Sequence, residues 1–173
     1  LFALAFKNDA GGYELRNPGY KGCTSPKDIT RIQFAEKKND ACFVFEGFMD
    51  YLSFLTIRHK NSLAYPCIDW QDYILNSTAN VDKALYPLGE YEKIHCLLDN
   101  DEAGRKATQA IQKEYGWRVR DASHLYSGHK DLNDHLCQKS SLPEKQTQSA
   151  KQPKQEEKNK QSPGEKRKRG RRL

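Results

Sequence analysis

The apolar run at residues 42–45, Cys-Phe-Val-Phe, is followed at once by Glu46 and Gly47, and this pattern most constrains the fold. A continuous apolar run without polar alternation is typical of a strand that is buried on both faces of a parallel sheet. After Gly47, apolar residues recur at helical spacing through about residue 58. A buried strand that leads directly into a helix predicts a layered α/β fold.

The same order of strand and helix continues along the chain. Residues 92–99 predict a second buried strand, and residues 102–116 predict a helix that stops at Gly116. Further strands are expected at 72–77 and 117–123 with a weaker one at 62–67, and further helices at 77–88, capped by Ser77 or Thr78, and at 131–137. We therefore expect a mostly parallel sheet flanked by helices over residues 41–137.

The two ends of the chain differ from this central part. Residues 1–40 predict a small N-terminal α+β subdomain, with two strands around the turn at Gly11 and Gly12 and a loop over residues 18–28. From residue 138 the composition changes to Gln, Lys, Ser, Pro and Glu without apolar periodicity, which predicts a disordered tail over residues 138–173.

The positive charge of the chain comes from this tail. Residues 139–173 carry 12 Lys and Arg against 4 Asp and Glu, whereas residues 1–138 carry 17 against 19. The formal net charge of +6 therefore combines a basic tail with a slightly acidic folded part. Dense basic charge is typical of a nucleic-acid-binding arm, although a solubilising extension has the same composition.

The five cysteines are scattered and form no C-x-x-C pair, so neither a zinc site nor a disulfide framework is indicated. We expect most of them to be small buried residues in a reducing compartment, which favours the cytoplasm. No apolar run approaches the length of a membrane-spanning helix, and no signal peptide is evident, so we expect no membrane partner. The chain begins at Leu1 and its one methionine is Met49, which predicts a fragment of a longer protein.

Acidic residues gather where the predicted strands end. Asp99, Asp101 and Glu102 follow the second buried strand within four positions, Glu46 ends the first strand with Asp50 one helical turn later, and Asp131 follows a third strand. In open α/β sheets, ligands bind at the carboxyl ends of the strands. Oxygen ligands of this kind favour Mg²⁺ or Mn²⁺. Acidic residues that complement a helix dipole explain the segment at 99–102 equally well when it is taken alone.

Residues 43–55 and 96–108, FVFEGFMDYLSFL and CLLDNDEAGRKAT, resemble the Toprim domain of bacterial-type DNA primases. The first family motif, E-G-[FY]-M-D, is matched at Glu46, Gly47 and Asp50, and the second, D-x-D-x-x-G-x-x-A, at Asp99, Asp101, Gly104 and Ala107. The segment KDLND at 130–134 resembles the third acidic segment with Asp131 as its leading acid, but Asn133 stands where a second acid is usual. This departure removes one potential metal ligand.

The resemblance implies a Rossmann-like Toprim fold and a primase that makes RNA primers from NTPs on single-stranded DNA, during replication or the transfer of mobile elements. Glu46 would act as general acid or base, or would organise the metal and the nucleophile. Asp99, Asp101, Asp50 and Asp131 would hold two or more Mg²⁺ or Mn²⁺ ions. The resemblance also implies a bacterial cytoplasmic protein, a zinc-binding module ahead of this chain, and a replicative helicase or relaxase as partner.

Basic residues add candidate contacts to nucleotide or template. Arg16, Lys21 and Lys27 flank a Gly/Pro-rich loop, and Arg105 and Lys106 open the helix after Asp101. Ordinary exposed charge, or pairing with the acidic residues, explains these side chains equally well. Two other functions stay open: strand cleavage by a Toprim nuclease or topoisomerase-like enzyme, and DNA binding without catalysis in a mobilisation protein. Topoisomerases use a tyrosine from another domain, and none of the nine tyrosines here stands in an identifiable context for that role.

Overall fold

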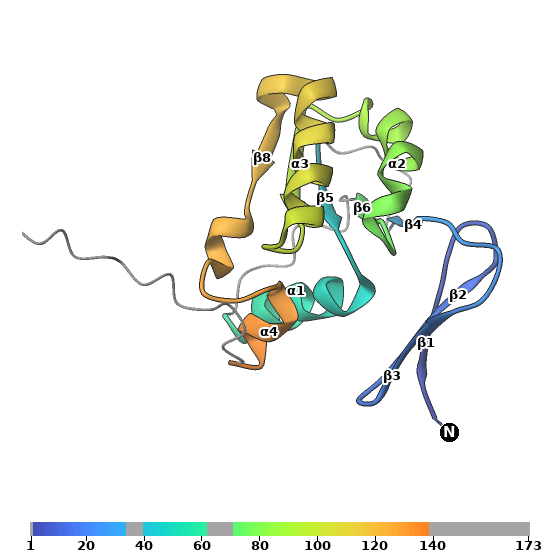
Figure 1. The fold of residues 1–173 in the computed structure, drawn as a ribbon. Coiled ribbons are helices and arrows are strands. Elements are labelled where there is room, and N and C mark those ends of the chain that lie inside the picture. The colour runs from blue at the N-terminus through green and yellow to red at the C-terminus, as the bar shows by residue number, and fades with distance from the viewer. Residues whose placement is uncertain (1, 34–39, 62–70, 139–173) are drawn as a thin grey trace, which may run out of the picture. The chain divides into compact units, whose positions relative to one another are not determined.

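A five-stranded sheet forms the centre of the protein, in a computed structural model that describes residues 2–33, 40–61 and 71–138. All of these residues belong to one unit of the chain, residues 1–143. The strand order is β4 (Thr30–Gln33), β6 (Gln71–Ile74), β5 (Ala41–Phe45), β7 (Lys93–Leu97) and β8 (Val119–Asp121). Only the β4–β6 pair is antiparallel (Figure 1). The predicted mostly parallel sheet is confirmed.

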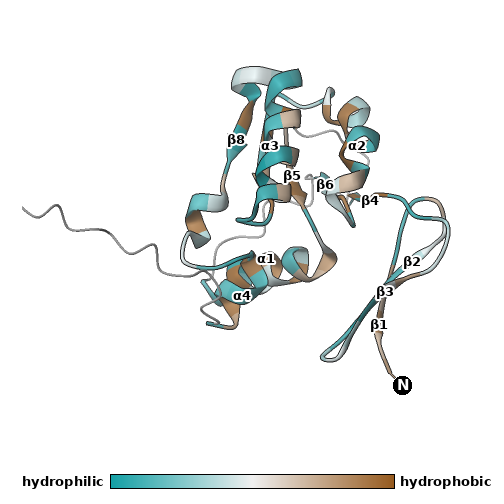
Figure 2. Ribbon diagram, in the orientation of Figure 1, coloured by the Kyte–Doolittle hydropathy of each residue, from teal (hydrophilic) through white to brown (hydrophobic). Residues whose placement is uncertain are grey.

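Burial on both faces explains the apolar run at residues 42–45. All five residues of β5 are buried, and their side chains alternate between two core clusters. Cys42 and Val44 pack with α2 (Val81–Leu88) and α3 (Glu102–Tyr115) on one face. Phe43 and Phe45 pack with α1 (Phe48–Lys60) and α4 (Leu132–Leu136) on the other face. Figure 2 shows the contrast between the hydrophobic β5 and the mainly hydrophilic α3.

Three short 3₁₀ helices adjoin these elements, η1 (Thr78–Asn80), η2 (Gly116–Arg118) and η3 (Ser123–Tyr126). The hydroxyl of Ser77 accepts a hydrogen bond from the backbone N–H of Ala79 over 3.3 Å and so caps η1, whereas α2 begins after Asn80 without a side-chain cap. The single helix expected at 77–88 is divided into η1 and α2. No helix among the described residues is long and apolar enough to span a membrane.

A separate antiparallel sheet precedes the central one, in the order β1 (Leu4–Lys7), β2 (Tyr13–Asn17) and β3 (Tyr20–Cys23). The two strands around the Gly11–Gly12 turn are confirmed, but the loop predicted over residues 18–28 is wrong at β3. The sequence Tyr-Lys-Gly-Cys has little strand propensity of its own, and pairing with β2 decides its conformation. Phe6 of β1 stacks on Phe48 of α1 with ring centroids 5.0 Å apart, which joins this sheet to the core.

Several strands are shorter than predicted. β6 ends at Ile74, and Asn76 two residues later adopts a left-handed backbone conformation with φ of 60°, which a strand cannot accommodate. β7 occupies residues 93–97 of the predicted 92–99. The weaker strand expected at 62–67 lies outside the described residues.

The expectation of mostly buried cysteines holds for only part of the set. Cys42 and Cys96 are buried in the core, whereas Cys23 and Cys137 are exposed because they lie at the end of β3 and just after α4. Cys67 lies outside the described residues.

Candidate active site

Carboxylates from three places in the chain meet at one edge of the central sheet. Phe45 and Leu97 pair in register at the ends of β5 and β7, so Glu46 and Asp99 leave the sheet at the same edge. Asp50 in the first turn of α1 and Asp131 at the start of α4 lie beside them. Together these four residues line a cavity of about 250 Å³. The structure thus brings together four of the five predicted catalytic and metal-binding residues.

Glu46 lies in this cavity with one carboxylate oxygen that lacks a partner. Its Oε2 is buried and accepts no hydrogen bond from any described residue, while the carboxylate accepts a hydrogen bond from the backbone N–H of Asp99. Burial, followed by the nearby charges of Asp99 and Asp101, raises the pKa of Glu46 to about 7. The site therefore holds more negative charge than its own basic groups compensate.

Asp50 is only 7% exposed, although it lies in the first turn of a helix. Its Oδ1 accepts a hydrogen bond from the backbone N–H of Asn133 over 3.2 Å, which ties α1 to α4. Burial, followed by the charges of Asp131 and Asp99, raises the pKa of Asp50 to about 7. A cation in the cavity would favour the ionised form of both carboxyl groups.

A lysine that the sequence analysis did not select lies among the carboxylates. The ammonium of Lys130 is 2.7 Å from Oδ2 of Asp99 and 3.8 Å from Oδ2 of Asp101. The hydrogen bond to Asp99 raises the pKa of Lys130. Burial still raises the pKa of Asp99 despite this partner. In the sequence, this role of Lys130 is indicated by its position directly before Asp131.

Asp101 and Asp131 each begin a helix. Oδ1 of Asp101 accepts the backbone N–H of Gly104 over 3.0 Å, and Oδ1 of Asp131 accepts the backbone N–H of Asp134 over 2.7 Å. The helix-start explanation therefore applies to both residues. Each cap uses one carboxylate oxygen, and Oδ2 of Asp101 faces the ammonium of Lys130.

Asn100 is a second residue that the sequence analysis missed. Its side-chain amide donates to the carbonyls of Ser123, Tyr126 and His129 at 3.4, 3.1 and 3.0 Å. Its backbone N–H donates to the carbonyl of Lys130 over 2.6 Å. Asn100 thereby fixes the loop that carries Lys130 and Asp131 to the end of β7. An amide between two aspartates looks like a spacer, and only its two side-chain donors hint at this role.

Asn133, which stands where a second acid was expected, forms a side-chain hydrogen bond to α1. Its amide donates to Oγ of Ser53 on α1 over 3.0 Å. Residue 133 therefore binds α4 to α1 through its side chain, and through its backbone it holds Asp50.

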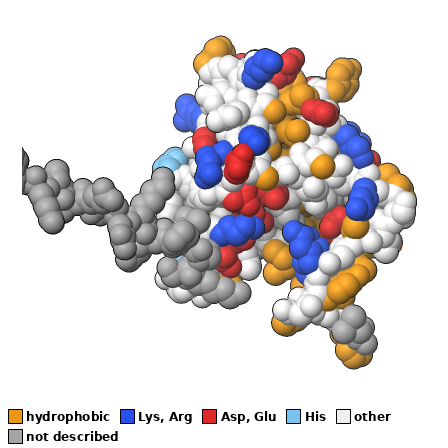
Figure 3. Space-filling model, viewed as in Figure 1, with side chains coloured by type: hydrophobic (Ala, Val, Ile, Leu, Met, Phe, Trp, Pro, Cys, Tyr) orange, Lys and Arg blue, Asp and Glu red, His pale blue; other side chains and the backbone are white. Residues whose placement is uncertain are grey.

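Basic residues approach the same cavity from the three-stranded sheet. Arg16 of β2 and Lys21 of β3 line the cavity, and with Lys27 they also line an adjoining one of about 310 Å³. Arg16 donates to the carbonyls of Leu15 and Gly22. Figure 3 shows acidic side chains in the middle of one face with basic side chains beside them.

The other two predicted basic residues point elsewhere. The guanidinium of Arg105 donates to the carbonyl of Asn100 over 2.7 Å, and Lys106 pairs with Glu102 over 2.6 Å on the exposed side of α3. Neither residue lines the two cavities. Arg105 is linked to the site through the carbonyl of Asn100.

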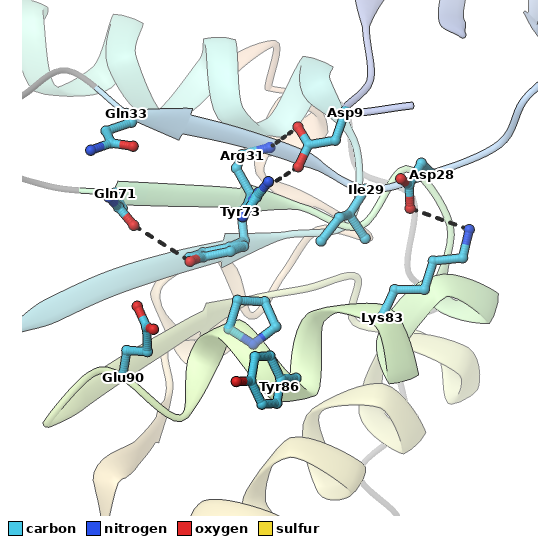
Figure 4. A pocket seen from close by; sticks show the side chains of 11 residues that line it. Asp9, Asp28, Ile29, Arg31, Gln33, Gln71, Tyr73, Lys83, Tyr86 and Glu90 are labelled. Carbon is cyan, nitrogen blue, oxygen red and sulfur yellow. Dashed lines mark hydrogen bonds and ion pairs between the residues drawn. The ribbon is translucent and has the colours of Figure 1, made fainter. Parts of the chain in front are cut away.

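A larger cavity, of about 760 Å³, lies between β4 and α2 and contains none of the predicted residues. Its charged side chains include two neutralised pairs, Arg31 with Asp9 and Lys83 with Asp28 (Figure 4). Size alone would select this cavity, but the smaller one gathers four carboxylates, and Oε2 of Glu46 there has no hydrogen-bond partner among the described residues. We therefore regard the smaller cavity as the candidate site.

No group of three or more His, Cys, Asp or Glu side chains among the described residues is arranged to hold a metal ion by itself. Mg²⁺ does not require such a group, because it commonly binds one or two carboxylates and completes its shell with water and substrate phosphates. The carboxylates around the cavity and the unpartnered Oε2 of Glu46 fit this manner of binding.

The family model described as Toprim-like matches residues 43–136, more than half of the chain. The chain belongs to the Toprim-like family. This confirms the resemblance found in the two acidic motifs. A second family model, a domain of unknown function, matches residues 1–25 of this Toprim-like chain. No curated protein matches the sequence.

The fold is related to that of a solved structure. The primase fragment of the bacteriophage T7 primase-helicase protein is 20% identical, with a TM-score of 0.53 over 79% of this chain and 58% of that one. The Toprim-like chain thus spans less than two thirds of that fragment. Primase domains of two gp4 subunits, in a structure with bacteriophage T7 lagging-strand DNA polymerase, an RNA/DNA hybrid and dTTP, are 19% identical, with a TM-score of 0.49 over 79% and 70% of the two chains.

Proposed function

We propose that this Toprim-like chain is the catalytic part of a primase-like nucleotidyltransferase, which joins NTPs into RNA primers on single-stranded DNA. The observation that carries the proposal is the single cavity in which Glu46, Asp50, Asp99 and Asp131 meet Arg16 and Lys21. Acidic groups that bind cations and basic groups that bind phosphates are both needed at a site that transfers a nucleotide. The primase fragment that shares the fold supports the same assignment.

Asp99, Asp101, Asp50 and Asp131 would hold Mg²⁺ or Mn²⁺ in this site. Bound ions of this kind neutralise phosphate oxygens and stabilise the charge that develops during phosphoryl transfer. Glu46, whose Oε2 is free of other hydrogen bonds among the described residues, would accept the proton of the attacking 3′-hydroxyl or orient that group. Arg16, Lys21 and Lys27 would bind the phosphates of the nucleotide or the template.

The wider setting is part of the same proposal. We expect a bacterial cytoplasmic protein that acts in replication or in the transfer of a mobile element, with a replicative helicase or relaxase as partner. The basic segment at 139–173 would bind the DNA backbone, since the rest of the chain is slightly acidic.

The test is a primer-synthesis assay with single-stranded template, labelled NTPs and either Mg²⁺ or Mn²⁺. We expect oligoribonucleotides that depend on the metal, and a loss of at least about 100-fold in Glu46→Gln and Asp99→Asn, because each removes a charge at the reacting centre. Glu102→Gln and Asp82→Asn are matched controls, since both acids are exposed and lie outside the cavity. They should retain activity.

Two other outcomes would replace the proposal. Nicking of DNA that depends on Glu46, without synthesis, would assign the site to a nuclease. No tyrosine among the described residues lines the cavity. DNA binding without synthesis or cleavage, and unchanged in Glu46→Gln, would assign the chain to a non-catalytic module.

A further inference from the structure

Lys130 occupies the position that a shared cation would take. Its ammonium lies within 2.7 Å of Oδ2 of Asp99 and 3.8 Å of Oδ2 of Asp101, the two residues whose spacing predicts a metal ion. Magnesium binds carboxylate oxygens at about 2.0–2.1 Å, so an ion held between these two oxygens would lie beside the ammonium. Two positive charges at that distance repel each other strongly in a partly buried site. The ion and the ammonium therefore exclude each other.

The structure allows the side chain to move while its backbone stays in place. The carbonyl of Lys130 accepts the backbone N–H of Asn100 over 2.6 Å, and the same asparagine holds the loop ahead of it. The side chain of Lys130 is 46% exposed, whereas that of Arg16 is 16% exposed and is bound to two backbone carbonyls. Of these two cations, Lys130 has the freedom to change partners.

Once displaced, the ammonium of Lys130 can contact the phosphates of a nucleotide in the same cavity. Lys130 lines the same cavity as Arg16 and Lys21, where the phosphates of a nucleotide would lie. An ammonium on a flexible stem binds phosphate oxygens as a mobile point charge.

We infer that Lys130 is an internal competitor of the divalent ion at Asp99 and Asp101, and that the displaced ammonium binds the phosphates of the incoming nucleotide. The inference rests on the metal and nucleotide sites of the proposed function. Its consequence is that ion and nucleotide favour each other's binding. The ion releases Lys130 toward the phosphates, and the phosphates hold Lys130 away from the ion.

The test is direct binding of Mn²⁺ to the whole chain, monitored through the electron paramagnetic resonance signal of free Mn²⁺, with and without ATP and corrected for the Mn²⁺ that ATP binds in protein-free samples. Without nucleotide, Lys130→Met should bind Mn²⁺ about 5- to 50-fold more tightly than the wild type, in the usual range of coupling between two ligands. Lys130→Arg should bind it no more tightly than the wild type, because the positive charge remains. The factor by which ATP improves Mn²⁺ binding should be smaller in Lys130→Met than in the wild type.

Lys106→Met is the matched control, since Lys106 pairs with Glu102 outside the cavity, and its Mn²⁺ affinity should not change. Equal or weaker Mn²⁺ binding by Lys130→Met would overturn the inference. If that variant does not fold, as judged by its thermal melt, Lys130→Gln and Lys130→Arg provide the same comparison. If the variants show the expected order of Mn²⁺ affinities but the protein makes no primers, the proposed function is refuted and the inference about Lys130 stands. Absence of Mn²⁺ binding in every variant would refute both.

Discussion

At the scale of single residues, an uncharged side chain organises the acidic site. Asn100 donates hydrogen bonds to three carbonyls of the segment 123–129 and so fixes the position of Asp131 and Lys130. The carboxylates on β5 and β7 are positioned by the sheet itself, but the third acidic segment follows a loop. The geometry of the cavity therefore depends on this amide as well as on the charged residues.

Replacing Asn100 with alanine should lower the free energy of unfolding by about 2–3 kcal/mol, because partly buried carbonyls lose their donor. It should also weaken Mn²⁺ binding, since Lys130 and Asp131 lose their support. Urea unfolding and Mn²⁺ titration measure the two effects. Asn80→Ala is the matched control, because the Asn80 amide donates to the single carbonyl of Leu75, and we expect a loss of about 1 kcal/mol without a change in Mn²⁺ affinity. Equal losses in the two variants would contradict the role of Asn100.

A buried aspartate away from the site should make stability depend on pH. Burial of Asp72 in β6 raises its pKa to about 7, with Arg58 opposing the shift, and its Oδ1 has no hydrogen-bond partner among the described residues. The pKa of Asp72 is higher in the folded protein than in the unfolded chain. The Asp72 carboxyl therefore makes its full contribution to the free energy of unfolding below about pH 4, where it is protonated in both states. The contribution is lost at about 1.4 kcal/mol per pH unit as pH rises toward 7.

The Asp72→Asn variant has no carboxyl group at this position, so it does not show this decrease in the free energy of unfolding as pH rises. The variant should therefore gain stability relative to the wild type as pH rises, by about 2–3 kcal/mol between pH 5 and pH 8. Urea denaturation of both proteins at the two pH values gives this difference directly. A difference that is the same at both pH values would show that Asp72 titrates normally.

At the scale of elements, the start of α3 is set by how closely it approaches the end of β7. A Cβ atom added to Gly104 would lie 2.2 Å from the carbonyl oxygen of Asp99, so only glycine allows Asp101 to cap the helix at this point. Gly104 of the second motif thus allows the close backbone approach that positions Asp99 and Asp101.

We expect Gly104→Ala to lower the free energy of unfolding by more than about 2 kcal/mol and to weaken Mn²⁺ binding, because the backbone of Asp99 must shift. Gly128→Ala is the control, since a Cβ atom there meets no atom within 4 Å. Its stability should change by no more than about 0.5 kcal/mol. Thermal melts of both variants provide the comparison, and a mild effect at residue 104 would mean that the helix start can move freely.

The elements also show what the sequence could predict. The β5–α1 and β7–α3 pairs were predicted because continuous apolar runs and helical spacing leave few alternatives, and their acidic ends followed from the parallel arrangement. Strand β3 was missed because its pairing with β2, a tertiary contact, outweighs its weak propensity. Lys130 and Asn100 were missed because their roles depend on a loop geometry that has no periodic signature.

At the scale of the whole molecule, charge is divided unevenly along the chain. Residues 1–138 carry two more acidic than basic residues, and the net positive charge comes from the last part of the sequence. Nucleic-acid affinity at moderate salt should therefore depend on the terminal basic cluster, which consists of Lys166, Arg167, Lys168, Arg169, Arg171 and Arg172.

Replacing these six residues with glutamine should weaken binding to a single-stranded oligonucleotide by at least about tenfold at low salt. The slope of log affinity against log salt concentration should fall by about 0.7 for each phosphate contact that is lost. Fluorescence anisotropy at several salt concentrations measures both quantities. An unchanged slope would identify the segment as a solubilising extension.

Strand β4 has a consequence for how chains of this kind can be recombined. It lies within residues 1–40, the predicted N-terminal subdomain, yet it forms the edge of the central sheet beside β6. A protein that began at residue 41 would leave one side of β6 unpaired, and an open edge of this kind recruits strands from other molecules and leads to aggregation. Asp28, just before β4, is held by Asn76 and Lys83. A recombined chain therefore has to inherit the edge strand together with the sheet that this strand protects.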